Sequence, residues 1–140
     1  MDLLDEPGGA GTWVARHGYD AAATEGLREV RDALWTVLEL GERAALNTVL
    51  AWGSYTPVLT PDGPGEVAVV EPGRRAAWDA ARDYLRLLTA APERIRRCAH
   101  PACVLWFHDT SRNGTRRWCS METCGNRIKA GRYYRRTHRS

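Results

Sequence analysis

The four cysteines of this 140-residue chain fall into two close pairs. Four residues separate Cys98 from Cys103, four separate Cys119 from Cys124, and fifteen residues lie between the pairs. Two short loops of this kind can each direct two thiolates towards one tetrahedral ion, as in four-cysteine zinc sites. The spacing therefore predicts one structural Zn²⁺ per chain, held by Cys98, Cys103, Cys119 and Cys124.

Other uses of these residues have weaker support. Disulfides are typical of secreted proteins, but residues 1–10, MDLLDEPGGA, have neither the basic start nor the apolar run of a signal peptide. A redox or nucleophilic thiol is disfavoured because the chain has no CxxC motif and no unpaired cysteine. His100 and His108 are rival ligands, although four cysteines already complete a tetrahedral sphere. Because a closed sphere leaves no position for a substrate, we expect the metal to fold its module and not to catalyse.

Charge divides the chain into two parts. Residues 94–140 contain twelve Lys and Arg and two acidic residues, a net charge of +10, whereas residues 1–93 contain eight basic and fifteen acidic residues, a net charge of −7. A basic block of this strength attracts polyanions, and nucleic acid above all. No apolar stretch has the length of a transmembrane helix, so we expect a cytoplasmic protein with no membrane partner.

The region before the cysteines is expected to be mainly helical. Apolar residues recur at helical spacing, and Gly or Pro follows the ends of the repeats, which predicts helices over residues 7–17, 21–40, 42–52 and 74–91. Two extended stretches joined by PDGPG predict a β-hairpin over about residues 57–70. The fold class is therefore mainly α with small β-hairpins, in which a helical N-terminal domain (1–92) precedes a zinc module (93–140).

The zinc module has its own predicted elements. Residues 104–108 and 116–118 are strand-like and flank an Asn113-Gly114 turn, which predicts a hairpin after the first cysteine pair. Ser120 is a good N-cap for a helix over about residues 121–136, with Cys124 in its first turn. A cysteine knuckle, a hairpin and then a helix with the last ligand is the order of a treble-clef-like zinc finger.

The helix after the last cysteine is the predicted contact surface for double-stranded DNA. At about 100° per residue, polar, cationic and aromatic positions fall on the face opposite Cys124. Such side chains can contact phosphates, base edges and sugars, and a helix fits the major groove. We expect nucleic-acid contacts from this helix and from arginines near it, namely Asn126, Arg127, Lys129, Arg132, Tyr133, Arg136, Arg116 and Arg112.

The run RCAHPACVLWFHDTSRNGTRRWCSMETCGNRIKAGRYYRR resembles the CGNR-type zinc finger, which is named for the tetrapeptide found here at residues 124–127. The front part is similar to the helical domain that precedes this finger in bacterial proteins described as stress-induced transcription regulators. The resemblance implies a zinc-dependent, DNA-binding transcription regulator with Cys98, Cys103, Cys119 and Cys124 as ligands. The helical domain would then sense a signal or mediate assembly, for instance as a homodimer.

Two other functions stay open on the sequence. The basic finger could dock on an acidic protein of the transcription machinery, as an interaction adaptor. It could instead bind RNA through Trp106, Phe107 and the tyrosines, which would give a preference for single strands. An enzyme is the least favoured class, because there is no convergent His/Asp/Glu set and no phosphate-binding glycine loop.

Overall fold

The structure, a computed structural model, describes residue 4 and residues 6–129. The chain forms two compact units, residues 1–85 and residues 86–140. The division falls within α4 (Pro72–Ala90), which therefore contributes to both units. Among the described residues, none of the helices has the combination of length and apolar composition that is needed to cross a bilayer.

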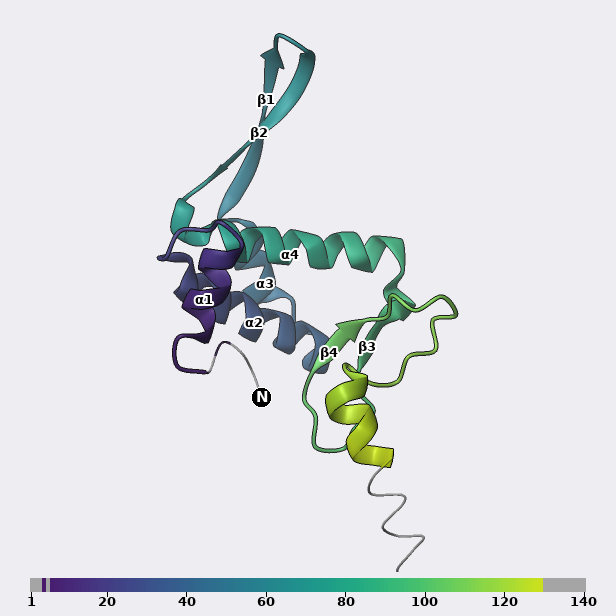
Figure 1. The fold of residues 1–140 in the computed structure, drawn as a ribbon. Helices are drawn as coiled ribbons and strands as arrows, with labels where there is room; N and C mark the ends of the chain where they lie inside the picture. Colours follow the sequence, from purple (N-terminus) through teal and green to yellow (C-terminus); the bar gives the residue numbers. More distant parts are fainter. Residues whose placement is uncertain (1–3, 5, 130–140) are drawn as a thin grey trace, which may run out of the picture. The chain divides into compact units, whose positions relative to one another are not determined.

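The first unit contains the predicted helices. They are α1 (Gly9–Arg16), α2 (Ala23–Leu40), α3 (Ala44–Leu50) and the first part of α4 (Figure 1). The predicted end of the longest front helix is confirmed. Gly41 has a φ of 73° and its N–H donates to the Val37 carbonyl at 3.0 Å, so a left-handed glycine terminates α2.

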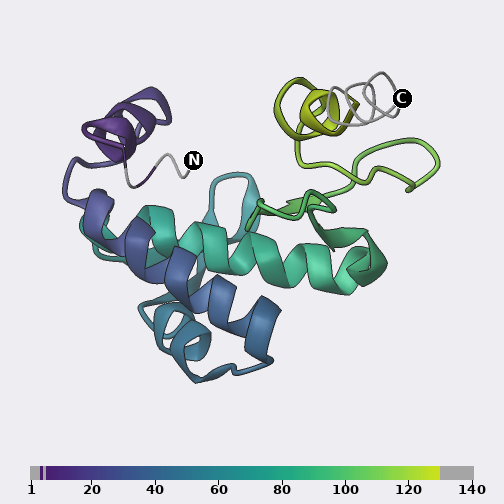
Figure 2. The same cartoon turned by 90° about the horizontal axis from the view of Figure 1, so that it is seen from below.

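Small apolar residues hold these helices together. Figure 2 shows α2 crossing α4 obliquely, with α3 beside α2. A buried cluster joins the three helices through Val30, Ala33, Leu46, Val49, Ala77 and Ala81. A second cluster, Val14, Ala23, Leu27 and Ala76, attaches α1. The periodic positions Leu27 and Val30 are thus core residues, and no ligand pocket is needed to explain them.

A two-stranded ribbon joins α3 to α4. Its strands are β1 (Gly53–Thr60) and β2 (Gly63–Val70), paired antiparallel from Gly53↔Val70 to Thr60↔Gly63. The predicted hairpin is confirmed and is longer than expected, because glycine and proline in both strands weaken the sequence signal for β-structure. The ribbon projects from the helices (Figure 1). It meets them at Gly53, where a Cβ atom would lie 2.6 Å from the Trp78 ring, so glycine allows the strand to start against α4.

The hairpin of the second unit differs from the predicted one. After η1 (Pro92–Arg94), β3 (Ile95–Arg97) pairs antiparallel with β4 (Trp106–His108). The predicted pairing of 104–108 with 116–118 is therefore wrong. The first cysteine pair lies in the connection between the two strands and not before them. Residues 116–118 form no strand, because the Arg116 N–H donates to the Asp109 carboxylate at 2.9 Å and not to a ladder partner.

The helix after the second cysteine pair starts where the sequence predicts. The Ser120 side chain accepts a hydrogen bond from the Thr123 N–H at 3.4 Å, which confirms the N-cap. The N–H groups of Cys124 and Gly125 both donate to the Ser120 carbonyl, at 3.1 and 3.0 Å, so η2 (Met121–Gly125) is a wide π-type turn. Residues 126–129 continue as α-helix. The predicted continuation to residue 136 lies outside the described residues.

Candidate metal centre and basic surface

The four cysteine sulfurs converge on one point. Their Sγ atoms all lie within 4.8 Å of one another, with 3.8 Å between Cys103 and Cys119 and 3.7 Å between Cys119 and Cys124. A tetrahedral Zn²⁺ with Zn–S bonds of about 2.3 Å separates its sulfur ligands by about 3.8 Å. A disulfide would bring two sulfurs to about 2.05 Å, and all four cysteines are free thiols. The cluster is therefore capable of binding a metal ion.

The first pair is positioned by the β3–β4 hairpin. Cys98 directly follows β3, and its N–H donates to the Leu105 carbonyl at 2.9 Å. The turn closes where the Cys103 N–H donates to the His100 carbonyl at 2.9 Å, and the His100 ring accepts the Ala102 N–H at 3.1 Å. The histidine thus shapes the loop, and the metal-capable cluster found among the described residues contains no histidine.

The second pair is attached to the first by two backbone contacts. The Cys119 N–H donates to the Cys98 Sγ at 3.4 Å, and the Ala99 N–H donates to the Arg117 carbonyl at 2.9 Å. Cys98 and Cys124 are buried, whereas Cys103 and Cys119 are half-buried. Each pair thus contributes one enclosed thiol and one thiol nearer the surface.

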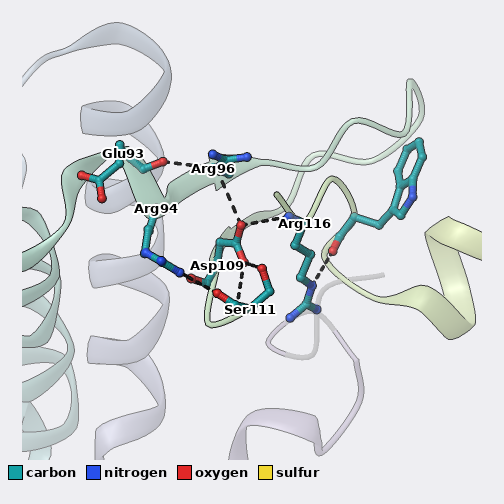
Figure 3. A network of polar contacts seen from close by, with 7 residues as sticks. Glu93, Arg94, Arg96, Asp109, Ser111 and Arg116 are labelled. Carbon is teal, nitrogen blue, oxygen red and sulfur yellow. Dashed lines mark hydrogen bonds and ion pairs between the residues drawn. The ribbon is translucent and has the colours of Figure 1, made fainter. Parts of the chain in front are cut away.

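A buried carboxylate organises the loop between the pairs (Figure 3). Asp109, which is 0% exposed, accepts at Oδ1 from the Ser111 N–H (2.9 Å) and hydroxyl (2.6 Å), and at Oδ2 from the Arg116 N–H (2.9 Å). The Ser111 hydroxyl is the main cause that lowers the pKa of Asp109; burial opposes it, and backbone N–H groups and Arg96 add to the lowering. The carboxylate therefore stays charged.

Asp109 is not among the site residues predicted from the sequence. A signal was present, because a lone acid in a basic stretch, followed by Thr110 and Ser111, is the pattern of an Asp side chain that caps its own turn.

The predicted nucleic-acid residues fall into three groups. Arg112, Asn126, Arg127 and Lys129 are exposed. Arg116 is half-buried, and its guanidinium donates to the Trp118 carbonyl at 2.8 Å and to the Cys119 carbonyl. Arg132, Tyr133 and Arg136 lie outside the described residues. The exposed group is therefore the described surface that could meet a polyanion.

Two family models match the chain. Residues 94–137 match the CGNR zinc finger, and residues 1–91 match ABATE, described as a putative stress-induced transcription regulator. The chain belongs to the ABATE family. With the CGNR finger attached, this ABATE protein is a zinc-finger regulatory protein. No curated protein matches the chain.

The CGNR tetrapeptide of this ABATE protein combines a metal-capable thiol with a steric requirement. Cys124 supplies the thiol, and Gly125 follows it inside the π-type turn. A Cβ atom at Gly125 would lie 2.7 Å from the Met121 Sδ and 3.3 Å from the Trp118 Cδ1. An alanine here would therefore displace the flexible Met121 side chain and lie in tight contact with Trp118, the residue before Cys119. Asn126 and Arg127 complete the motif and are exposed.

The thiols of the ABATE protein's finger differ in acidity. Burial raises the pKa of the Cys98 thiol, but the backbone amides of Cys119 and His100 and the neighbouring thiols outweigh burial and lower it to about 7. Burial raises the pKa of Cys119 to about 12, and the hydrogen bonds with the thiols of Cys124 and Cys98 act in the same direction. The surroundings thus favour the thiolate form of Cys98 and disfavour that of Cys119, and a bound cation would favour the thiolate form of both.

Proposed function

We propose that this ABATE protein is a zinc-dependent DNA-binding transcription regulator. One Zn²⁺ per chain, bound by Cys98, Cys103, Cys119 and Cys124, would hold a treble-clef-like finger over residues 93–140. The helical domain over residues 1–92 would sense a signal or mediate assembly in the cytoplasm, as a homodimer or with the transcription machinery. The observation that carries the proposal is the presence of a metal-capable thiol cluster and an exposed set of cations in the same short module.

The bound ion would cross-link two loops that the chain already brings together. Zinc supplies two positive charges, which reduce the charge of four thiolates to about −2. The module nevertheless has a large excess of arginine, so its surface stays cationic. Arg112, Arg127 and Lys129 would then contact phosphates and fix the register of the finger on DNA, and Asn126 would contact a base edge.

The salt dependence of binding tests this surface. We expect the double substitution Arg127→Ala with Lys129→Ala to weaken binding to duplex DNA and to lower the slope of log K against log salt by about one for each phosphate that the variant no longer neutralises. Fluorescence anisotropy across a range of salt concentrations measures both. Arg43→Ala is the matched control, because Arg43 is an exposed cation in the first unit. An unchanged slope in the double variant would reject these residues as DNA contacts.

The same titration distinguishes the other functions. An adaptor for an acidic protein would show weak, sequence-independent DNA binding at low salt. An RNA-binding module would prefer single-stranded RNA to duplex DNA at equal salt. Phe107 gives little support to base stacking, because the Arg116 guanidinium already lies 5.1 Å from the centre of its ring.

A further inference from the structure

We propose that Asp109 and Arg116 are positioning residues that place Cys119 for metal binding. The inference rests on the proposed zinc site and assigns Arg116 a role other than the phosphate contact expected from its charge. Its basis is a continuous series of hydrogen bonds that runs from Arg94, just before the strand that leads to Cys98, through a buried carboxylate, to the backbone of Cys119.

The series begins on the hairpin that holds the first cysteine pair. Asp109 directly follows β4, and its N–H donates to the Arg94 carbonyl at 2.8 Å. The Arg94 guanidinium returns to the carbonyls of Asp109 (3.0 Å) and Ser111 (2.8 Å). Asp109 is thereby fixed to the segment that leads into β3 and on to Cys98.

The carboxylate then closes the loop between the pairs. Its Oδ1 holds Ser111 at the start of the loop, and its Oδ2 holds the Arg116 N–H at the end (Figure 3). A buried carboxylate is costly unless hydrogen bonds satisfy it, and no buried side-chain N or O atom of the described residues lacks a partner. Both carboxylate oxygens of Asp109 thus accept hydrogen bonds, and the bond at Oδ2 restricts where residue 116 can lie.

The Arg116 side chain continues the series to the ligand. Its Nε donates to the Trp118 carbonyl at 2.8 Å, and its Nη2 donates to the Cys119 carbonyl. A planar guanidinium fixes two acceptors at once, which a lysine ammonium does poorly. The Cys119 N–H also donates to the Cys98 Sγ, so Cys119 is held at its N–H and at its carbonyl. Groups that orient ligands in this way affect metal affinity by about 10- to 100-fold.

Metal titration of the reduced 140-residue chain tests the role without DNA. Zinc affinity is measured by competition with a chromophoric chelator, and the ligand set is observed from the visible and near-ultraviolet absorption of the Co²⁺-substituted protein. We expect Asp109→Asn and Arg116→Lys each to lower zinc affinity by about tenfold or more. We also expect a changed Co²⁺ spectrum at saturation, because Cys119 would no longer be held in place.

Each variant has a matched control in the same unit. Glu93→Gln removes one exposed carboxylate, and Arg86→Lys alters one exposed guanidinium. Both controls should keep the wild-type affinity and spectrum. Lower affinity with a wild-type Co²⁺ spectrum would reduce the two residues to a general stabilising role and overturn the proposal, as would unchanged affinity. If the wild-type protein binds neither Zn²⁺ nor Co²⁺, the proposed zinc site is rejected. That result can be told apart from the two outcomes above, in which the wild-type protein binds metal.

Discussion

Removal of zinc is expected to unfold the second unit and to abolish DNA binding, while the first unit stays folded. Among the described residues of the second unit, the buried hydrophobic side chains are those of Cys98 and Cys124. A module without a hydrophobic core of its own depends on its metal, and structural zinc contributes about 10–16 kcal/mol in comparable fingers. The first unit has two buried apolar clusters, so we expect it to stay folded when the metal is removed.

Limited proteolysis with and without a chelator measures this difference. We expect new cleavage sites after chelation only beyond residue 85, together with loss of the anisotropy signal from DNA. Cys124→Ser should reproduce both effects without chelator, because one of four thiolates is missing. A chelated protein that keeps its protease resistance beyond residue 85 would contradict a metal-dependent fold.

The second large effect is expected from Trp78→Ala, which should destabilise the first unit by about 3–5 kcal/mol. Trp78 is 2% exposed, and its Nε1–H donates to the Leu50 carbonyl at 3.0 Å. Its ring also packs at 5.3 Å from Tyr55 and lies 4.6 Å from the Arg82 guanidinium. The substitution removes this packing and leaves the Leu50 carbonyl without its indole partner.

Urea unfolding of the first unit measures the change in the free energy of unfolding. Trp35→Ala is the matched control, because Trp35 is 48% exposed and the same truncation there should change stability far less. The zinc content of Trp78→Ala should stay at the wild-type value, since Trp78 belongs to the first unit. Equal destabilisation by the two tryptophan substitutions would show that the ring is not central to the core.

The helices could be predicted because burial repeats along one face of each. Leu27 and Val30 recur at helical spacing and are both buried, and Gly41 ends the helix by a backbone conformation that other residues rarely adopt. Such signals are local, so the sequence displays them directly. The same holds for the Ser120 N-cap, which depends on a residue three positions away.

The hairpin of the finger could not be predicted from local signals. Asn113-Gly114 resembles a hairpin turn, and Gly114 does have a φ of 62°, but its N–H closes a small turn by donating to the Ser111 carbonyl at 3.2 Å. The strand that pairs with β4, residues 95–97, has only three residues, two of them arginine. Neither length nor composition marks it as a strand.

The candidate site shows the same contrast. The cysteine cluster followed from spacing, because thiols have few other uses in such a pattern. The role of Asp109 depends on Arg94, fifteen residues before it, and on Arg116, seven residues after it. The guanidinium groups of both arginines donate to backbone carbonyls. No sequence pattern distinguishes an arginine that donates to a backbone carbonyl from one that is exposed and can contact a phosphate.

Gly125 links the CGNR tetrapeptide to Met121, a residue outside the motif. The Met121 thioether lies over the position where a Cβ atom at residue 125 would stand, and Met121 itself is 47% exposed. An alanine at 125 would force this flexible side chain outward and so reshape the exterior of the helix start. The effects of substitutions at positions 121 and 125 are therefore coupled. A substitution at either position alone changes the surface at the start of the helix.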